Sequence, residues 1–270
     1  MSYKYIVMDM DDTLLTSDNE ISECTLSYLK EKQKEGFKLI LASGRPTAGM
    51  MKHADLLDLK NYGGYVVSYN GAFVIDATNN EVVFKQTISK EDALEIIDFC
   101  REQNFFYLTY LEDKIVHDRS HEYMNIESEL TGLPMERFED LKTVIKEDVP
   151  KMMGVDYEAN IAKINQELNG KFNEQISSTI SKPYFLEFMD QKVSKGKTLK
   201  KLLDSLDSDF SEVIAFGDSL NDYDMLENAG IGVAMGNAND TIKNVADVVT
   251  EDHNHDGIVI ALEKLLIKEK

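Results

Sequence analysis

Short apolar runs alternate with longer amphipathic segments at the start of the chain, and this alternation limits the fold more than any other feature. Residues 3–8 and 38–42 are typical of buried strands, and residues 22–35 between them are typical of a helix that ends at Gly36. A strand, a helix and a second strand in succession form a parallel pair, because the helix returns the chain to the same end of the sheet. The N-terminal part is therefore predicted to begin a parallel sheet.

The C-terminal part repeats the alternation. Its predicted elements are a helix over 197–206, a strand over 212–216, a helix over 222–228, a strand over 231–234 and a helix over 258–267. One more strand is predicted over 65–69, before the turn signal Asn70-Gly71. Strands from both ends of the chain can share one sheet with helices on both faces. The predicted fold class is α/β, with a doubly wound (Rossmann-like) parallel-sheet core.

The middle of the chain has a different pattern of predicted helices and strands. Helical segments there mix with alternating strands such as 105–110 and 184–188, with Lys and Glu interleaved. This stretch is predicted to be a second α/β domain that interrupts the core. The expected division is core over 1–82, inserted domain over 83–189 and core again over 190–270.

The charge composition excludes some partners. Lys and Arg total 29 against 49 Asp and Glu, so the net charge is -20. Such a chain repels nucleic acid and acidic lipid surfaces, and a phosphate site in it needs a local cation. The two cysteines, Cys24 and Cys100, define no disulfide framework, and the first apolar run stops at Asp9, which is too early for a signal peptide or membrane span. A cytoplasmic protein is expected.

Three carboxylates follow directly on the first predicted strand. Asp9, Asp11 and Asp12 lie in the stretch 9–13, which ends in Thr13. The carboxyl ends of strands in an open parallel sheet are where ligands bind, and crowded carboxylates there favour a hard divalent ion such as Mg²⁺. A solvated, Asp-rich turn that caps the next helix is the alternative.

The second strand and a later helix start offer groups for an anion. Ser43, Gly44 and Arg45 follow the strand over 38–42, where a hydroxyl and backbone N–H groups at a helix start can hold phosphate. Lys195 precedes a predicted helix and can act as a point charge on a phosphoryl oxygen. Taken singly, Ser43 and Gly44 are better explained as an ordinary cap and turn, and Lys195 as a surface lysine.

A second acidic strand end occurs late in the chain. Asp218, Ser219, Asn221 and Asp222 follow the strand over 212–216 and open a helix. This strand end and the one at Asp9 can share one metal ion if the two strands lie in the same sheet.

The order of these four elements resembles the haloacid dehalogenase superfamily of phosphotransferases. The order is Asp-x-Asp-x-Thr, Ser-Gly-Arg, Lys-Gly and Gly-Asp-Ser-x-Asn-Asp, each at a strand end or helix start. Within the superfamily the chain resembles the Cof-type sugar-phosphatase group, in which an α/β cap (class IIB) is inserted between the second and third elements. Residues 68–72 and 231–238 are similar to that group as well. The resemblance implies a Mg²⁺-dependent phosphatase for a small phosphorylated metabolite.

The resemblance also implies residue roles. Asp9 would be the nucleophile, and Asp11 would protonate the leaving alcohol and then activate water. Phosphate would be held by Met10 (through its backbone), Ser43, Gly44, Lys195 and Asn221. The metal would be held by Asp9, Asp11 (through its carbonyl) and Asp218, with Ser219 beside them. Asp222, Thr13 and Arg45 would form the surrounding layer, with Asp222 orienting Lys195 or a metal-bound water.

One departure concerns Asp12, where the family often has glycine. It adds a charge near the reacting carboxylates and is expected to affect metal affinity and rate. His253 and His255, in an acidic loop, are interpreted as solvated side chains, with a metal site as the alternative.

Several functional alternatives stay open on the sequence. Sugar phosphates lead as substrates, followed by phosphorylated cofactors such as flavin mononucleotide or pyridoxal phosphate. A sugar-phosphate mutase and a non-catalytic sensor of a phosphorylated metabolite are the other candidates. The oligomeric state is open.

Overall fold

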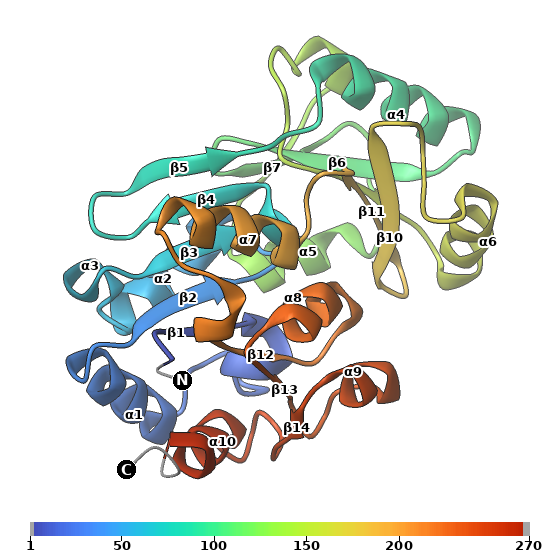
Figure 1. Ribbon diagram of the computed structural model, residues 1–270. Coiled ribbons are helices and arrows are strands. Elements are labelled where there is room, and N and C mark those ends of the chain that lie inside the picture. The colour runs from blue at the N-terminus through green and yellow to red at the C-terminus, as the bar shows by residue number, and fades with distance from the viewer. Residues whose placement is uncertain (1–2, 267–270) are drawn as a thin grey trace. The chain divides into compact units, whose positions relative to one another are not determined.

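The computed structural model describes residues 3–266. The chain folds into two compact units (Figure 1). The first unit combines the residues up to Phe84 with those from Ser194 onward, and the second is Lys85–Val193. The first unit is thus built from both ends of the chain. Each unit has its own sheet and its own hydrophobic core.

The first unit contains an eight-stranded sheet with β1 (Tyr5–Met8) in its interior. In spatial order the strands are β14 (Val248–Val249), β13 (Ile231–Ala234), β12 (Val213–Gly217), β1, β2 (Lys38–Ala42), β3 (Tyr65–Ser68), β4 (Phe73–Asp76) and β5 (Glu81–Lys85). From β14 to β3 every neighbouring pair is parallel. The carboxyl ends of β1, β2 and β12 therefore meet at one edge of the sheet.

Helices cover both faces of this sheet, which confirms the doubly wound fold class. The helices that pack on one face are α1 (Glu23–Lys34), α2 (Thr47–Leu56), α3 (Leu59–Tyr62) and α10 (Gly257–Leu266). The helices that pack on the other face are α7 (Lys195–Ser205), α8 (Tyr223–Asn228) and α9 (Asp240–Val245).

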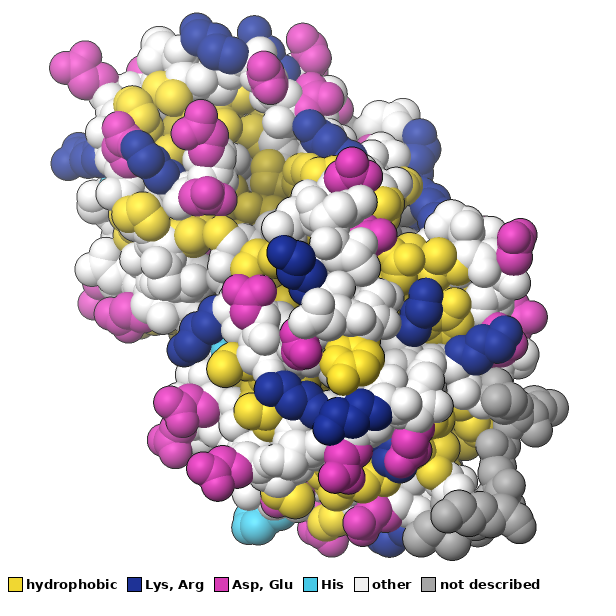
Figure 2. Space-filling view, turned by 90° about the vertical axis from the view of Figure 1, so that its left-hand side faces the viewer, with side chains coloured by type: hydrophobic (Ala, Val, Ile, Leu, Met, Phe, Trp, Pro, Cys, Tyr) yellow, Lys and Arg dark blue, Asp and Glu magenta, His cyan; other side chains and the backbone are white. Residues whose placement is uncertain are grey.

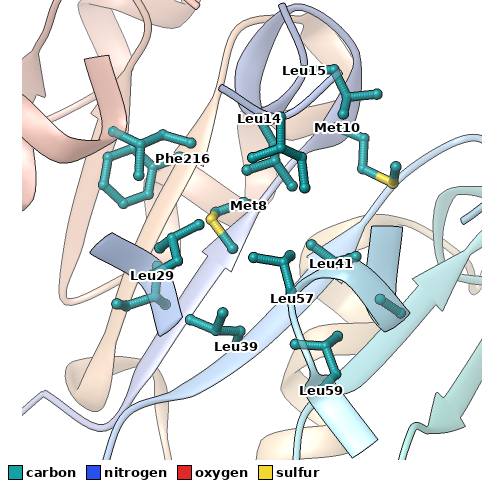
Figure 3. Packing of buried hydrophobic residues seen from close by; sticks show 14 of the residues in the cluster. Met8, Met10, Leu14, Leu15, Leu29, Leu39, Leu41, Leu57, Leu59 and Phe216 are labelled. Carbon is teal, nitrogen blue, oxygen red and sulfur yellow. The ribbon is translucent and has the colours of Figure 1, made fainter. Parts of the chain in front are cut away.

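Strand β1 contributes side chains to both cores. Ile6 and Met8 belong to the core on the α1 side, where Met8 lies among Leu29, Leu39 and Phe216 (Figure 3). The intervening residues of β1 belong to the core on the α7 side. Because successive strand residues point to opposite faces and both faces are covered, the strand is apolar throughout.

The edge of the sheet beyond β3 differs from the predicted parallel arrangement. Strand β4 runs antiparallel to β3, with Val66 opposite Ile75. Only the turn Tyr69–Ala72 joins these strands, and a parallel pair would need a crossover of a dozen or more residues. Asn70 makes the turn with a φ of 54°, a left-handed conformation that asparagine tolerates.

Predicted element ends agree with the structure to within a few residues. Helix α7 begins at Lys195, two residues before the predicted start, because the Ser194 side chain accepts a hydrogen bond from the backbone N–H of Lys197. The last helix was predicted over 258–267. Its observed span is Gly257–Leu266, and Ile267 lies outside the described residues.

The second unit contains a six-stranded sheet. In spatial order its strands are β10 (Ile176–Lys182), β11 (Phe185–Asp190), β9 (Met152–Val155), β6 (Phe106–Leu111), β7 (Lys114–His117) and β8 (Met135–Arg137). Helices α4 (Lys90–Glu102) and α6 (Glu158–Leu168) pack on this sheet around Tyr107 and Phe188, and α5 (Met124–Thr131) follows β7 in the chain. All neighbouring strands are antiparallel except β7 and β8.

The surface carries both signs of charge. In Figure 2, lysine and arginine side chains are interspersed with acidic ones on the face shown. Within residues 3–266, no helix combines the length and the apolar character needed to cross a membrane.

Candidate active site

Strand β1 places Asp9 at the carboxyl edge of the first sheet. The backbone N–H of Asp9 donates to the Phe216 carbonyl at 3.0 Å, so Asp9 is held against β12 directly after the strand ends. A helical turn, Met10–Leu14, follows at once and buries the Met10 side chain in the core. The Met10 side chain is therefore not available to a ligand. The Asp9 side chain is itself buried.

Lys195 brings a positive charge to Asp9. Its Nζ lies 2.5 Å from Asp9 Oδ1 and 2.6 Å from Asp222 Oδ1, and its side chain has no exposed surface. Burial alone lowers the pKa of an ammonium, but the charges of Asp222 and Asp9 outweigh it and raise the pKa of Lys195 above its usual value. Lys195 is a buried cation between two carboxylates and not a surface lysine.

Strand β12 places Asp218 beside the same group. Thr13 donates its hydroxyl to Asp218 Oδ1 at 3.0 Å, and the Ser219 hydroxyl donates to Asp218 Oδ2 at 2.8 Å. Asp222 fixes this turn, because its Oδ2 accepts the backbone N–H groups of Asp218 and Ser219, each at 3.0 Å. Loops from the two ends of the chain are thus joined at the edge of the sheet.

The carboxylates of this edge suit a divalent cation. Within residues 3–266, one carboxylate oxygen from each of Asp9, Asp218 and Asp222 lies within 4.8 Å of the other two, and all three residues are buried. Burial raises the pKa of Asp9 well above its usual range, although Lys195 opposes the rise. Burial and the charge of Asp222 raise the pKa of Asp218 to about 7. One lysine does not balance three carboxylates, and oxygen donors of this kind match Mg²⁺.

The hydrogen bonds separate the three carboxylates by role. Both oxygens of Asp222 already accept hydrogen bonds, from Lys195 and from two backbone N–H groups. Each oxygen of Asp218 accepts only one hydroxyl, which can rotate away, and Asp9 accepts Lys195 at one oxygen, so these two carboxylates are better suited than Asp222 to hold a cation. The resemblance predicted a metal role for the same two side chains, and a place beside Lys195 for Asp222.

Strand β2 places Ser43 and Gly44 at the same edge of the sheet. The Ser43 hydroxyl accepts the backbone N–H of Arg45 at 3.1 Å, and the Ser43 carbonyl accepts the backbone N–H of Asn70 at 2.8 Å. The Asn70 side chain in turn accepts a hydrogen bond from Asn221 Nδ2 at 2.9 Å. The predicted phosphate-binding residues Ser43, Gly44 and Asn221 are thereby linked.

Asn70 was not predicted as a site residue. A Cβ on Gly44 would lie 3.1 Å from Asn70 Oδ1, so the two residues pack closely. The Asn70-Gly71 pair was interpreted as a turn signal, which accounts for its backbone conformation, and as part of the stretch 68–72 that resembles the Cof-type group. The sequence feature that could have indicated a site role for Asn70 was its position at the carboxyl end of a predicted parallel strand.

Asp11 points to a different partner from Asp9. The Arg45 guanidinium donates to both of its carboxylate oxygens, and Arg45 Nη2 also donates to Asn19 Oδ1 at 2.6 Å. The Asp11 side chain is 40% exposed, whereas that of Arg45 is buried. Of these two residues, Asp9 is therefore buried and Asp11 is accessible.

Asp12 does not join the carboxylate group at the site. Its φ of 59° lies in the left-handed region, which explains why glycine suits this position and why aspartate is tolerated there. Its side chain is 52% exposed and lies 3.6 Å from His253 Nε2. The charge that was expected to crowd the reacting carboxylates is directed toward a histidine instead.

Most of the chain matches one protein family. The family model for haloacid dehalogenase-like hydrolases matches residues 6–262. The chain belongs to this family. The predicted resemblance and the assignment as a hydrolase are confirmed.

Relatives of this haloacid dehalogenase-like hydrolase match it along nearly their whole length. YxeH of Bacillus subtilis is 32% identical over 98% of this chain and 99% of that protein. The phosphatase YwpJ of the same organism is 29% identical, over 97% of this chain and 100% of that protein. A solved haloacid dehalogenase-like hydrolase from Bacteroides thetaiotaomicron shares 34% identity with a TM-score of 0.91, covering 98% of this chain and 100% of that one. The hydrolase thus belongs with phosphatases of this family.

Proposed function

We propose that the chain is a Mg²⁺-dependent phosphatase that hydrolyses small phosphate monoesters through an aspartyl-phosphate on Asp9. The observation that carries the proposal is the pairing of Asp9 with Lys195 beside Asp218, at the edge of a parallel sheet. A nucleophilic carboxylate and positive charge for phosphoryl oxygens are the two requirements of this chemistry.

In the first step, an oxygen of Asp9 attacks phosphorus as the bond from phosphorus to the leaving oxygen breaks. Asp11 donates its proton to that oxygen, and the alcohol departs. In the second step, water attacks the phosphorus of the aspartyl-phosphate while Asp11 accepts a proton from the water, so phosphate is released and Asp9 is regenerated. Bound Mg²⁺ would supply positive charge that keeps Asp9 ionised and compensates the transferring phosphoryl group.

Other residues of the edge are assigned to binding the phosphoryl group. Lys195, Ser43 and Asn221 would contact its oxygens, together with the backbone at Met10 and Gly44. Asp9 and Asp218 would hold the metal, with the carbonyl of Asp11, and Ser219 and Thr13 would orient Asp218. The hydrogen bonds from Thr13 and Ser219 to Asp218 support this assignment.

The second unit, Lys85–Val193, is assigned the role of the cap, which selects the leaving group and excludes water. The predicted boundaries of the inserted domain, residues 83 and 189, are part of this proposal. Sugar phosphates are the first candidates for substrate because of the resemblance to the Cof-type group, and phosphorylated cofactors are the second. A cytoplasmic location and a small phosphorylated metabolite as the partner complete the proposal.

The test is inorganic phosphate release from a panel of sugar phosphates, flavin mononucleotide and pyridoxal phosphate, each with Mg²⁺ and with chelator. Asp9→Asn is the matched variant, because it keeps the side-chain shape and removes the nucleophile. Release that needs both Mg²⁺ and Asp9 is expected. Near-normal release by Asp9→Asn would remove Asp9 as the nucleophile, and phosphate returned to the substrate would indicate a mutase. Tight binding of panel members without turnover would indicate a sensor.

A further inference from the structure

A loop near the C-terminus hydrogen-bonds to the segment that follows the nucleophile. The loop, residues 252–256, lies between β14 and α10. The backbone N–H of Ser17 donates to Asn254 Oδ1 at 3.0 Å, and Asn254 Nδ2 donates to the Ser17 hydroxyl at 2.9 Å. Both bonds span 237 positions of the chain. Backbone and side chain of Ser17 are therefore held by one asparagine.

Asn237 makes a second connection to the same segment. Its Nδ2 donates to the Asp12 carbonyl at 2.8 Å, and its Oδ1 accepts the backbone N–H of His253 at 3.1 Å. One side chain thus joins the loop to the peptide between Asp12 and Thr13. Thr13, the second residue of this peptide, donates its side-chain hydroxyl to Asp218.

His253 adds a third contact. Its Nε2 lies 3.2 Å from the Ser17 hydroxyl and 3.6 Å from Asp12 Oδ1, and its side chain is only 10% exposed. The neighbouring His255 is 71% exposed and pairs with Asp252 inside the loop. The two histidines of the loop therefore differ in what they contact, and the interpretation of both as solvated is wrong for His253.

The segment held in this way contains an unusual backbone conformation. Asp12 occupies the left-handed region, which aspartate tolerates less readily than glycine does, so contacts that hold this peptide favour the observed turn. The turn Met10–Leu14 carries Asp11 and Thr13, and it follows Asp9 directly. A rotation of the peptide after Asp12 would move both side chains, and small misplacements of reacting groups reduce rates strongly.

We propose that Asn237, His253 and Asn254 form a brace that positions the turn after the nucleophile for the reaction. They are positioning residues, because they act through the backbone and side chains of Asp12 and Ser17, which are not among the groups assigned to phosphate. This proposal rests on the proposed function for its effect on rate. Its effect on the turn itself can be measured without any substrate.

The variants are Asn237→Ala and Asn254→Ala, with His255→Gln as the control from the same loop. With p-nitrophenyl phosphate and Mg²⁺, we expect each alanine variant to lower kcat about tenfold while KM changes less than about twofold, because binding groups stay in place. The double variant is expected to lose less than the product of the two single effects, because both act on one turn. His255→Gln is expected to match the wild type.

Amide hydrogen exchange of the segment over residues 10–17 is the second measurement. Faster exchange in this segment is expected for Asn237→Ala and Asn254→Ala, and unchanged exchange for His255→Gln. Wild-type exchange in both alanine variants would overturn the brace, and so would faster exchange with an unchanged kcat. If the wild type itself shows no turnover, the proposed function fails, and the exchange data alone then decide whether the brace exists.

Discussion

Arg45 holds both carboxylate oxygens of Asp11 at once. Its Nε lies 2.9 Å from Asp11 Oδ2 and its Nη2 lies 2.7 Å from Asp11 Oδ1. A planar guanidinium that meets a carboxylate at two points fixes the orientation of that carboxylate, whereas an ammonium meets it at one point. Because Arg45 is buried and Asp11 is accessible, the arginine is the fixed partner of the pair.

Replacement of Arg45 by lysine is therefore expected to lower kcat about tenfold with little change in KM. The charge is kept and the two-point geometry is lost. The measurement is steady-state phosphate release at saturating Mg²⁺. A variant with wild-type kcat would show that the orientation of Asp11 does not depend on the guanidinium.

Mg²⁺ is expected to stabilise the wild type against heat but not Asp218→Asn. A ligand that binds only the folded state, present at about a hundred times its Kd, adds about 2.7 kcal/mol, or roughly 5 °C in Tm for a chain of this size. Without metal, Asp218→Asn should be at least as stable as the wild type, because the raised pKa of Asp218 shows that its ionised form is disfavoured. A Mg²⁺-dependent rise in the variant's Tm would exclude Asp218 as a required ligand.

His53 is expected to make the fold sensitive to mild acid. It is buried in α2, and burial with the nearby charge of Arg45 lowers its pKa. The folded chain thus binds a proton at His53 less readily than the unfolded chain, so stability is lost as pH falls below about 6.5. Urea unfolding at pH 7.5 and pH 5 should show a smaller acid loss, by about 1 kcal/mol, in His53→Leu. The exposed His255→Gln is the control, and an equal acid loss in all three proteins would contradict the assignment.

Tyr107→Phe is expected to destabilise the second unit by about 1–3 kcal/mol. The Tyr107 hydroxyl donates to Asp118 Oδ2 at 2.7 Å and accepts from Arg101 Nε at 2.7 Å, so its loss leaves two charged groups with fewer partners. Urea unfolding measures the effect, with Tyr157→Phe, at an exposed position of the same unit, as the control. Equal stability of the two variants would mean that water replaces the hydroxyl without cost.

The sequence predicted the central strands of the core well, because a strand buried on both faces is recognisable from its own residues. Residues 38–42 are apolar enough on both faces to identify β2 without tertiary information. The edges of the sheet lack this signal. Strand β14 has two residues and β5 is largely exposed, so pairing with a neighbour defines them more than composition does.

The candidate site, like the sheet, was predictable only in part. Carboxylates at strand ends could be assigned to one place, because parallel strands bring their carboxyl ends together. The partner of each side chain could not be assigned, since it depends on loops that meet only in the folded chain. The contact between Asn237 and Asp12 joins residues 225 positions apart, and the left-handed conformation that directs Asp12 away from the site is visible only in the structure.

The division of the core between the two ends of the chain has a consequence during synthesis. Thr13 and Asp218 are 205 positions apart, so at about 5–20 residues per second the ribosome needs roughly 10–40 s to supply the second after the first. During that time β1 has left the ribosome without β12, its partner on one side. The nascent chain thus carries an apolar strand with one side unpaired while the whole intervening segment is translated, and Asp9 emerges long before Lys195, which pairs with it in the folded chain.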